Sequence, residues 1–236
     1  MDGKQVCGAK AHGRSMHLLS VVSHEDAMVL AQVQVGEKTN EISAAGGLLA
    51  KLELSGTVVT VVTMDALLTQ RKTAEQILEQ GGHYLMVVKS NQRRLHEAIA
   101  ELFDVGGWLP SEIGTRCWKY TSSEKGHGRL ESRTLESSTV LEGWLNWPGV
   151  GQVMRRTTRR ESQATGKVEQ QTAYAITDLS PQQAGPKELE RLWRGHWTIE
   201  NRVHYPRDVS MGEDAGRAYK GSTPQATTTL NNCIGN

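Results

Sequence analysis

Two acidic residues occupy positions where a carboxylate could bind a ligand such as a metal ion. Asp65 directly follows the apolar run 57–64, and open α/β sheets place ligands beyond the carboxyl ends of their strands. A simpler interpretation is that Asp65 caps the helix that follows it. Glu200 comes seven residues after Trp193 and four after His196, so the three would share one face of a helix.

Glu200 and a third acid, Asp2, also have simpler interpretations. A helix of this composition could pack its tryptophans into the core and leave Glu200 in solvent. Asp2 belongs to Asp2-Gly3-Lys4 at the chain end, where residues are commonly frayed. Sequence statistics alone would therefore assign Asp2 no function.

Basic residues are concentrated in a few segments, although the net charge is only +1. The clusters are 89–94 and 155–160. The glycine-containing stretch 124–133, which holds His127 and Arg129, is densely charged with both signs. That stretch could be a loop that contacts a DNA phosphate, or a hairpin turn followed by a strand with a charged outer face. A near-neutral charge does not suit a DNA-coating protein, but acidic metal ligands would offset basic phosphate contacts in a nuclease.

The apolar pattern predicts the elements that must position these residues. Strands are expected over residues 15–22, 28–35, 57–64 and 84–88. Helices are expected over residues 40–54, 69–80 and 93–103. The β-branched run 57–64 is typical of a central strand buried on both faces. The helix over 40–54 would form a βαβ crossover, which indicates an α/β fold with a mixed sheet and helices on its faces.

The pattern changes after Gly107. Short β-like runs are expected over residues 129–135, 151–156 and 169–176, and a helical pattern resumes at Pro186. The predicted organisation is a core over 1–107, a mainly β insertion over 108–185, a helical part of the core over 186–220 and an irregular tail over 221–236.

The remaining composition narrows the class of protein. The three cysteines, Cys7, Cys117 and Cys233, are scattered and form no zinc spacing, which favours a reducing cytoplasm and no structural zinc. The N-terminus has no apolar signal region, and no apolar run approaches the roughly 20 residues of a membrane span.

Six segments resemble the H-repeat-associated transposases, a branch of the bacterial insertion-sequence DDE transposases. The segments are Asp2-Gly3-Lys4, 37–42, Thr63-Met64-Asp65-Ala66, Lys89-Ser90-Asn91-Gln92, 124–133 and His196-Trp197-Thr198-Ile199-Glu200-Asn201. The last continues to Asp208-Val209, Glu213-Asp214-Ala215 and Arg217. Each segment is weak alone, but all six occur in the family's order and cover nearly the whole chain.

The resemblance implies an RNase H-like fold with an Asp-Asp-Glu metal site. Carried over by position, the catalytic and metal-binding residues are Asp2, Asp65 and Glu200, and Trp193 and His196 stand where the family places an aromatic and a basic residue before its Glu. The implied cofactor is Mg²⁺ or Mn²⁺, as two ions, since these hard cations prefer carboxylate oxygen. The implied reaction is strand cleavage and strand transfer at insertion-sequence ends.

The implied partner is double-stranded DNA, both the element ends and the target, with a homodimer when active. The DNA-binding residues expected from the matching segments are Lys4, Lys89, Asn91, His127, Arg129 and His196.

Three departures from the family pattern suggest a decayed copy, cut at both ends. The family's segment before Asp-Gly-Lys, which includes its first strand, is absent and leaves Asp2 without a rigid mount. Pro206 would break a helix after Glu200, and the tail 231–236 lacks the family's apolar helix. The alternatives are an active transposase domain, a non-catalytic remnant that at most binds DNA, and another RNase H-like nuclease. The order of the matching segments argues against the last.

Overall fold

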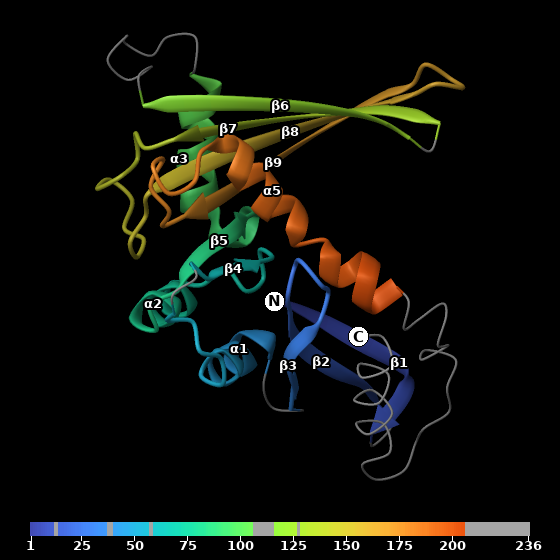
Figure 1. Cartoon of the computed structure of the whole chain (residues 1–236), viewed down its shortest axis with the longest axis vertical. Coiled ribbons are helices and arrows are strands. Elements are labelled where there is room, and N and C mark those ends of the chain that lie inside the picture. The colour runs from blue at the N-terminus through green and yellow to red at the C-terminus, as the bar shows by residue number, and fades with distance from the viewer. Residues whose placement is uncertain (12–13, 37–39, 57–58, 106–115, 127, 206–236) are drawn as a thin grey trace. The chain divides into compact units, whose positions relative to one another are not determined.

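The computed structural model describes residues 1–11, 14–36, 40–56, 59–105, 116–126 and 128–205 (Figure 1). The chain divides into two compact units. Unit 1 comprises Met1–Val58 and Trp193–Asn236, and unit 2 comprises Val59–Leu192. None of the helices in these ranges is long and apolar enough to cross a membrane.

Unit 1 is built on a three-stranded antiparallel sheet of β1 (Asp2–Ala11), β2 (Arg14–Val22) and β3 (Val29–Gln34). Consecutive residues of the middle strand β2, such as Leu18 and Leu19, are buried although they point to opposite faces. The helix α1 (Glu41–Leu49) packs against β2 and β3. The strands expected over 15–22 and 28–35 are confirmed.

The start of unit 1 differs from expectation. Asp2 is the first residue of β1 and pairs with Ser20 of β2. The Ser20 residue is fully buried. The prediction of a frayed Asp2 without a rigid mount is therefore wrong, because the strand that follows Asp2 pairs along β2. β1 was not predicted, because residues 2–11 alternate poorly between apolar and polar.

Unit 2 is built on a mixed six-stranded sheet in the order β4-β5-β9-β8-β7-β6. The strands β4 (Val61–Met64) and β5 (His83–Val88) are parallel and joined by α2 (Arg71–Glu79). All other neighbours are antiparallel. This is the α/β fold with a mixed sheet and flanking helices that the sequence predicted.

The mainly β segment is confirmed as four long strands that extend the same sheet (Figure 1). These strands are β6 (Cys117–Gly126), β7 (Arg129–Ser138), β8 (Gln152–Ser162) and β9 (Val168–Thr177). β9 joins them to the parallel pair by pairing with β5. The helix α3 (Arg93–Asp104) packs against β8 and β9, and α5 (Pro186–Gly195) follows β9 in the chain.

Three expectations about elements are corrected. The parallel crossover runs through α2 and not through the helix over 40–54, because β3 pairs with β2 in the other sheet. Of the strand expected over 57–64, residues 57 and 58 lie outside the described residues and Val61–Met64 form β4. Within the described residues β4 is at the edge of its sheet, with β5 as its hydrogen-bonded neighbour, and is not central. β6 was not predicted, because the middle of this strand consists mostly of Lys, Ser, Thr and Glu.

Candidate active site

Asp65 lies at the carboxyl end of β4, where its carboxylate is held by a tight turn. Its Oδ1 accepts hydrogen bonds from the backbone N–H groups of Leu67 at 3.1 Å and Leu68 at 3.2 Å. Among the described residues, these are the only groups that bond to the carboxylate, and Oδ2 has no such partner. Asp65 therefore caps the turn that directly follows it. It does not cap the helix α2, whose N-cap is Gln70.

The turn that carries Asp65 is tied to the segment after β5. Thr69 Oγ1 donates to the Val87 carbonyl at 2.6 Å. The side-chain amide of Asn91 donates to the Ala66 carbonyl at 2.6 Å, and that of Gln92 donates to the Thr69 carbonyl at 2.8 Å. β4 and β5 are parallel, so their carboxyl ends lie at the same edge of the sheet. The turn after β4 and the segment after β5 are therefore close enough to form these bonds.

The matching segment Lys89-Ser90-Asn91-Gln92 therefore has a structural role that sequence reasoning missed. Ser90–Gln92 form the 3₁₀ turn η1 that leads into α3, and Lys89 is exposed beside it. An Asn and a Gln at adjacent positions after a buried strand were the available signal, since both can donate to loop carbonyls.

In unit 1, Asp2 and Lys4 both lie on β1. Asp2 is half-buried, and its Oδ1 accepts a hydrogen bond from the Gly3 N–H at 2.9 Å. Lys4, a predicted DNA contact, is buried, with 7% of its surface exposed. Its contact with DNA stays a prediction.

Glu41, in the matching segment 37–42, has structural contacts that sequence reasoning missed. Its carboxylate lies against Gly3 so closely that a Cβ at Gly3 would collide with it. Glu41 Oε1 also pairs with His17 Nε2 of β2 at 2.5 Å, and the Glu41 side chain is only 12% exposed. Asn40 precedes it as the N-cap of α1, with Oδ1 accepting from the Ser43 N–H at 2.9 Å. The segment around 40–42 thus connects α1 to β1 and β2.

The helix before Glu200 is interrupted, which corrects the expected continuous helix. α5 ends at Gly195, where a Cβ would collide with the His24 ring. Two i→i−3 bonds then close a turn, from His196 N–H to the Trp193 carbonyl at 3.3 Å and from Trp197 N–H to the Arg194 carbonyl at 3.1 Å. A face predicted from 3.6-residue periodicity does not carry across this break.

Glu200 lies on the π-helical turn η2 (Ile199–His204) beyond the break. Ile199 anchors this turn in a buried cluster with Val22 and Ala27, and Arg202 Nη1 donates to the Glu25 carbonyl at 3.3 Å. The Glu200 side chain is exposed, whereas His196 is buried. The buried Trp193 and the exposed Glu200 match the simpler interpretation of this segment, and the metal-binding role of Glu200 stays a prediction.

Arg129 begins β7 just after the turn of the β6–β7 hairpin, and His127 lies outside the described residues. The hairpin interpretation of 124–133 is confirmed. Arg129, Arg133 and Arg160 all pair with the buried Glu131. Burial would raise the pKa of Glu131, but the charges of Arg133, Arg160 and Arg129 outweigh it and hold that pKa below its usual value.

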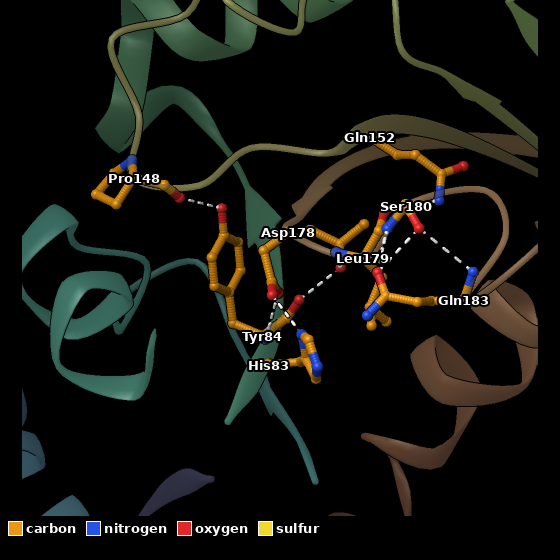
Figure 2. A network of polar contacts seen from close by, with 9 residues as sticks. His83, Tyr84, Pro148, Gln152, Asp178, Leu179, Ser180 and Gln183 are labelled. Atoms are coloured by element: carbon orange, nitrogen blue, oxygen red, sulfur yellow. Dashed lines mark hydrogen bonds and ion pairs between the residues drawn. The ribbon is translucent and has the colours of Figure 1, made fainter. Parts of the chain in front are cut away.

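A second polar network lies at the opposite end of β5 from Asn91 (Figure 2). Asp178 accepts from the Tyr84 N–H at 2.7 Å and pairs with His83 Nδ1 at 2.5 Å. Thr177 Oγ1 donates to the Tyr84 carbonyl at 2.6 Å, and the Tyr84 hydroxyl donates to the Pro148 carbonyl at 2.7 Å. Burial, aided by the charge of Asp178, raises the pKa of the Tyr84 phenol. This network joins β5 to the end of β9 and has a structural character.

The predicted metal ligands are divided between the two units. Asp2 and Glu200 belong to unit 1 and Asp65 to unit 2. In the described ranges, no group of three His, Cys, Asp or Glu side chains is gathered as a metal site. The donor type nevertheless suits Mg²⁺ or Mn²⁺, because carboxylate oxygens are hard ligands and Asp65 retains an oxygen without a bond to a described residue.

Comparison with known proteins gives one consistent result. A family model described as a transposase DDE domain matches residues 2–223. The chain is 30% identical to "Putative transposase YncI" of Escherichia coli O157:H7 over 95% of this chain and 57% of that protein. It is 31% identical to "H repeat-associated putative transposase YhhI" of Escherichia coli strain K12 over 95% of this chain and 59% of that protein. The chain thus spans less than three fifths of the length of these relatives.

Proposed function

Because this chain belongs to the transposase DDE domain family, we propose that it cleaves and joins DNA strands with Asp2, Asp65 and Glu200 as its metal ligands. The mixed α/β sheet is consistent with the RNase H-like fold of that family. The observation that carries the proposal is Asp65, which is fixed at the carboxyl edge of a parallel strand pair with one carboxylate oxygen left over.

The chemistry follows from what these side chains can do. Divalent ions held by the three carboxylates would activate the attacking oxygen and stabilise the leaving 3′ oxygen. The turn at 65–68 holds Asp65 Oδ1 by two amides, so its orientation is set before DNA arrives. Water is the first nucleophile, and the freed 3′-OH at the element end is the second.

Cationic residues would hold the DNA backbone around this site. Lys89 and Arg129 are exposed and fit contacts with phosphate oxygens. Lys4, Asn91, His127 and His196 complete the proposed set of DNA contacts. Double-stranded DNA of the element ends and of the target is the proposed partner, with a homodimer as the active form.

A second candidate is a protein that binds element DNA without cutting it. The break between α5 and η2 favours it, because Glu200 is carried on a short π-helical turn and not on a continuous helix. We propose that cleavage by this copy is accordingly weak.

A cleavage assay separates the two candidates. The chain is incubated with duplex DNA from the flanks of its gene, with Mg²⁺ or Mn²⁺, and with Asp65→Ala and the exposed control Glu101→Ala beside it. Weak metal-dependent cleavage that falls at least about 100-fold in Asp65→Ala and is kept in Glu101→Ala supports the enzyme. Gel-shift binding without cleavage in any variant supports the remnant. The absence of both binding and cleavage contradicts both candidates.

A further inference from the structure

We propose that Asn91 and Gln92 are positioning residues for the Asp65 carboxylate, in addition to any contact with DNA. This role rests on the proposed metal function of Asp65. Neither residue contacts that carboxylate itself. Both act on the backbone of the turn that orients it.

The bonds form a continuous path from η1 to the carboxylate. Asn91 donates to the Ala66 carbonyl at 2.6 Å and Gln92 to the Thr69 carbonyl at 2.8 Å. Ala66 and Thr69 flank the two residues, Leu67 and Leu68, whose N–H groups bond to Asp65 Oδ1. The two amide side chains therefore hold both ends of the peptide segment that presents these donors.

The rest of the turn supports this assignment. Thr69 Oγ1 bridges the Asp65 and Val87 carbonyls at 2.9 and 2.6 Å, which fixes the turn to β5 itself. The turn is also fixed by packing, because Ala66, Leu68 and Thr69 are buried. With these contacts in place, the Asn91 and Gln92 bonds mainly set the direction of the two amides toward Oδ1.

This arrangement has a consequence for a bound metal. Two amides on Oδ1 leave Oδ2 as the oxygen that a cation would take, so Asp65 is expected to bind through one oxygen. Groups that orient a ligand in this way typically contribute 10- to 100-fold to metal affinity. Loss of the Asn91 or Gln92 donor should let the turn rotate and weaken binding without removing a ligand.

The test uses isosteric variants that replace the amide donor with a carboxylate. Asn91→Asp and Gln92→Glu keep the side-chain shape, and Asn146→Asp makes the same change at an exposed site of unit 2. Two readouts are taken on the full chain by NMR: amide exchange at Leu67 and Leu68, and Mn²⁺ affinity from paramagnetic broadening of the same amides. Thermal unfolding is measured alongside as a readout of general stability.

We expect exchange at Leu67 and Leu68 to rise about tenfold in both variants and Mn²⁺ affinity to fall about tenfold, with Asn146→Asp unchanged. The added negative charge alone would strengthen Mn²⁺ binding, so a loss is diagnostic of orientation. A conservative variant that keeps the donor, Asn91→Gln, should recover part of the affinity. Unchanged exchange, or a fall in unfolding temperature with unchanged affinity, overturns the positioning role.

The proposed function fails in a different way. If Mn²⁺ does not broaden these amides in the wild-type chain, or if Asp65→Asn leaves the broadening intact, Asp65 is not a metal ligand. The exchange measurement then still decides whether Asn91 and Gln92 hold the turn.

Discussion

The two units hold their acidic residues in different ways. In unit 2, Asp65 is fixed by two amides of its own turn, and that turn is bonded to β5 and η1. In unit 1, Glu200 is an exposed side chain on η2, and its backbone is anchored through the neighbour Ile199. The Asp65 carboxylate is therefore oriented directly, whereas for Glu200 only the segment that carries the side chain is anchored.

The difference shows what the matching segments contribute. In unit 1, Asn40 caps α1 and Glu41 lies against β1 and β2. In unit 2, Asn91 and Gln92 bond to the turn after β4. These four residues of the matching segments thus connect elements inside one unit, in addition to any contact with metal or DNA.

The largest effects are expected from the two cores. Leu19 of β2 and Leu85 of β5 are both fully buried, so Leu19→Ala and Leu85→Ala should each lower the free energy of unfolding by about 3–4 kcal/mol. If each unit has its own core, native-state hydrogen exchange should show lost protection chiefly in the unit that carries the substitution. Equal losses in both units from either change would mean that they unfold as one.

A smaller effect is expected from the buried acidic residues of the two units. Asp178 is 6% exposed on its side chain and accepts from Tyr84 N–H, so Asp178→Ala leaves a buried donor unpaired and should cost about 2–3 kcal/mol. Glu41→Ala in unit 1 should cost about 1 kcal/mol, because its partner His17 is 40% exposed. Urea unfolding measures both, and a larger loss for Glu41→Ala would reverse the ranking.

The helix caps give a third comparison. Asn40→Ala removes the side-chain bond to the Ser43 N–H and should destabilise unit 1 by about 1 kcal/mol. In α2 the N-cap Gln70 has extended backbone and no side-chain cap bond, so Gln70→Asp should stabilise unit 2 by about 0.5 kcal/mol. Thermal unfolding of the two variants should shift in opposite directions, and a shared direction would contradict the cap assignment.

An effect as small as that of the caps concerns acid stability in unit 2. Because the folded pKa of Glu131 is lowered, its stabilisation is present at neutral pH and is lost as pH falls from the ordinary Glu value of 4.5 through the lower folded value. Glu131→Gln should lower stability at pH 7 by about 0.5–1 kcal/mol, since two of its three arginine partners are substantially exposed. The wild-type and variant stabilities should converge below pH 4.5. A constant difference across this range would show that Glu131 acts through packing.

Local patterns were enough to predict much of each unit. The buried run at 84–88 appears as His83–Val88, the amphipathic stretch at 93–103 as Arg93–Asp104, and Asn40 as the cap of α1. These features depend on residues a few positions apart, which a sequence displays directly. The H-repeat-associated resemblance is likewise confirmed, because six ordered segments carry it jointly.

Tertiary structure alone decided the rest. β6 owes its existence to pairing with β7, and its polar residues give no apolar alternation to read. Gly195, where α5 ends before Glu200, lies against the His24 ring, which is distant in the chain. The attachment of the Asp65 turn involves Asn91, which lies 26 residues away from Asp65. The sequence by itself determined the family, most of the element types and the acidic candidates, because these follow from short local patterns and their order along the chain. It did not determine which side chains hold those acids in place, because such contacts form only when distant segments meet.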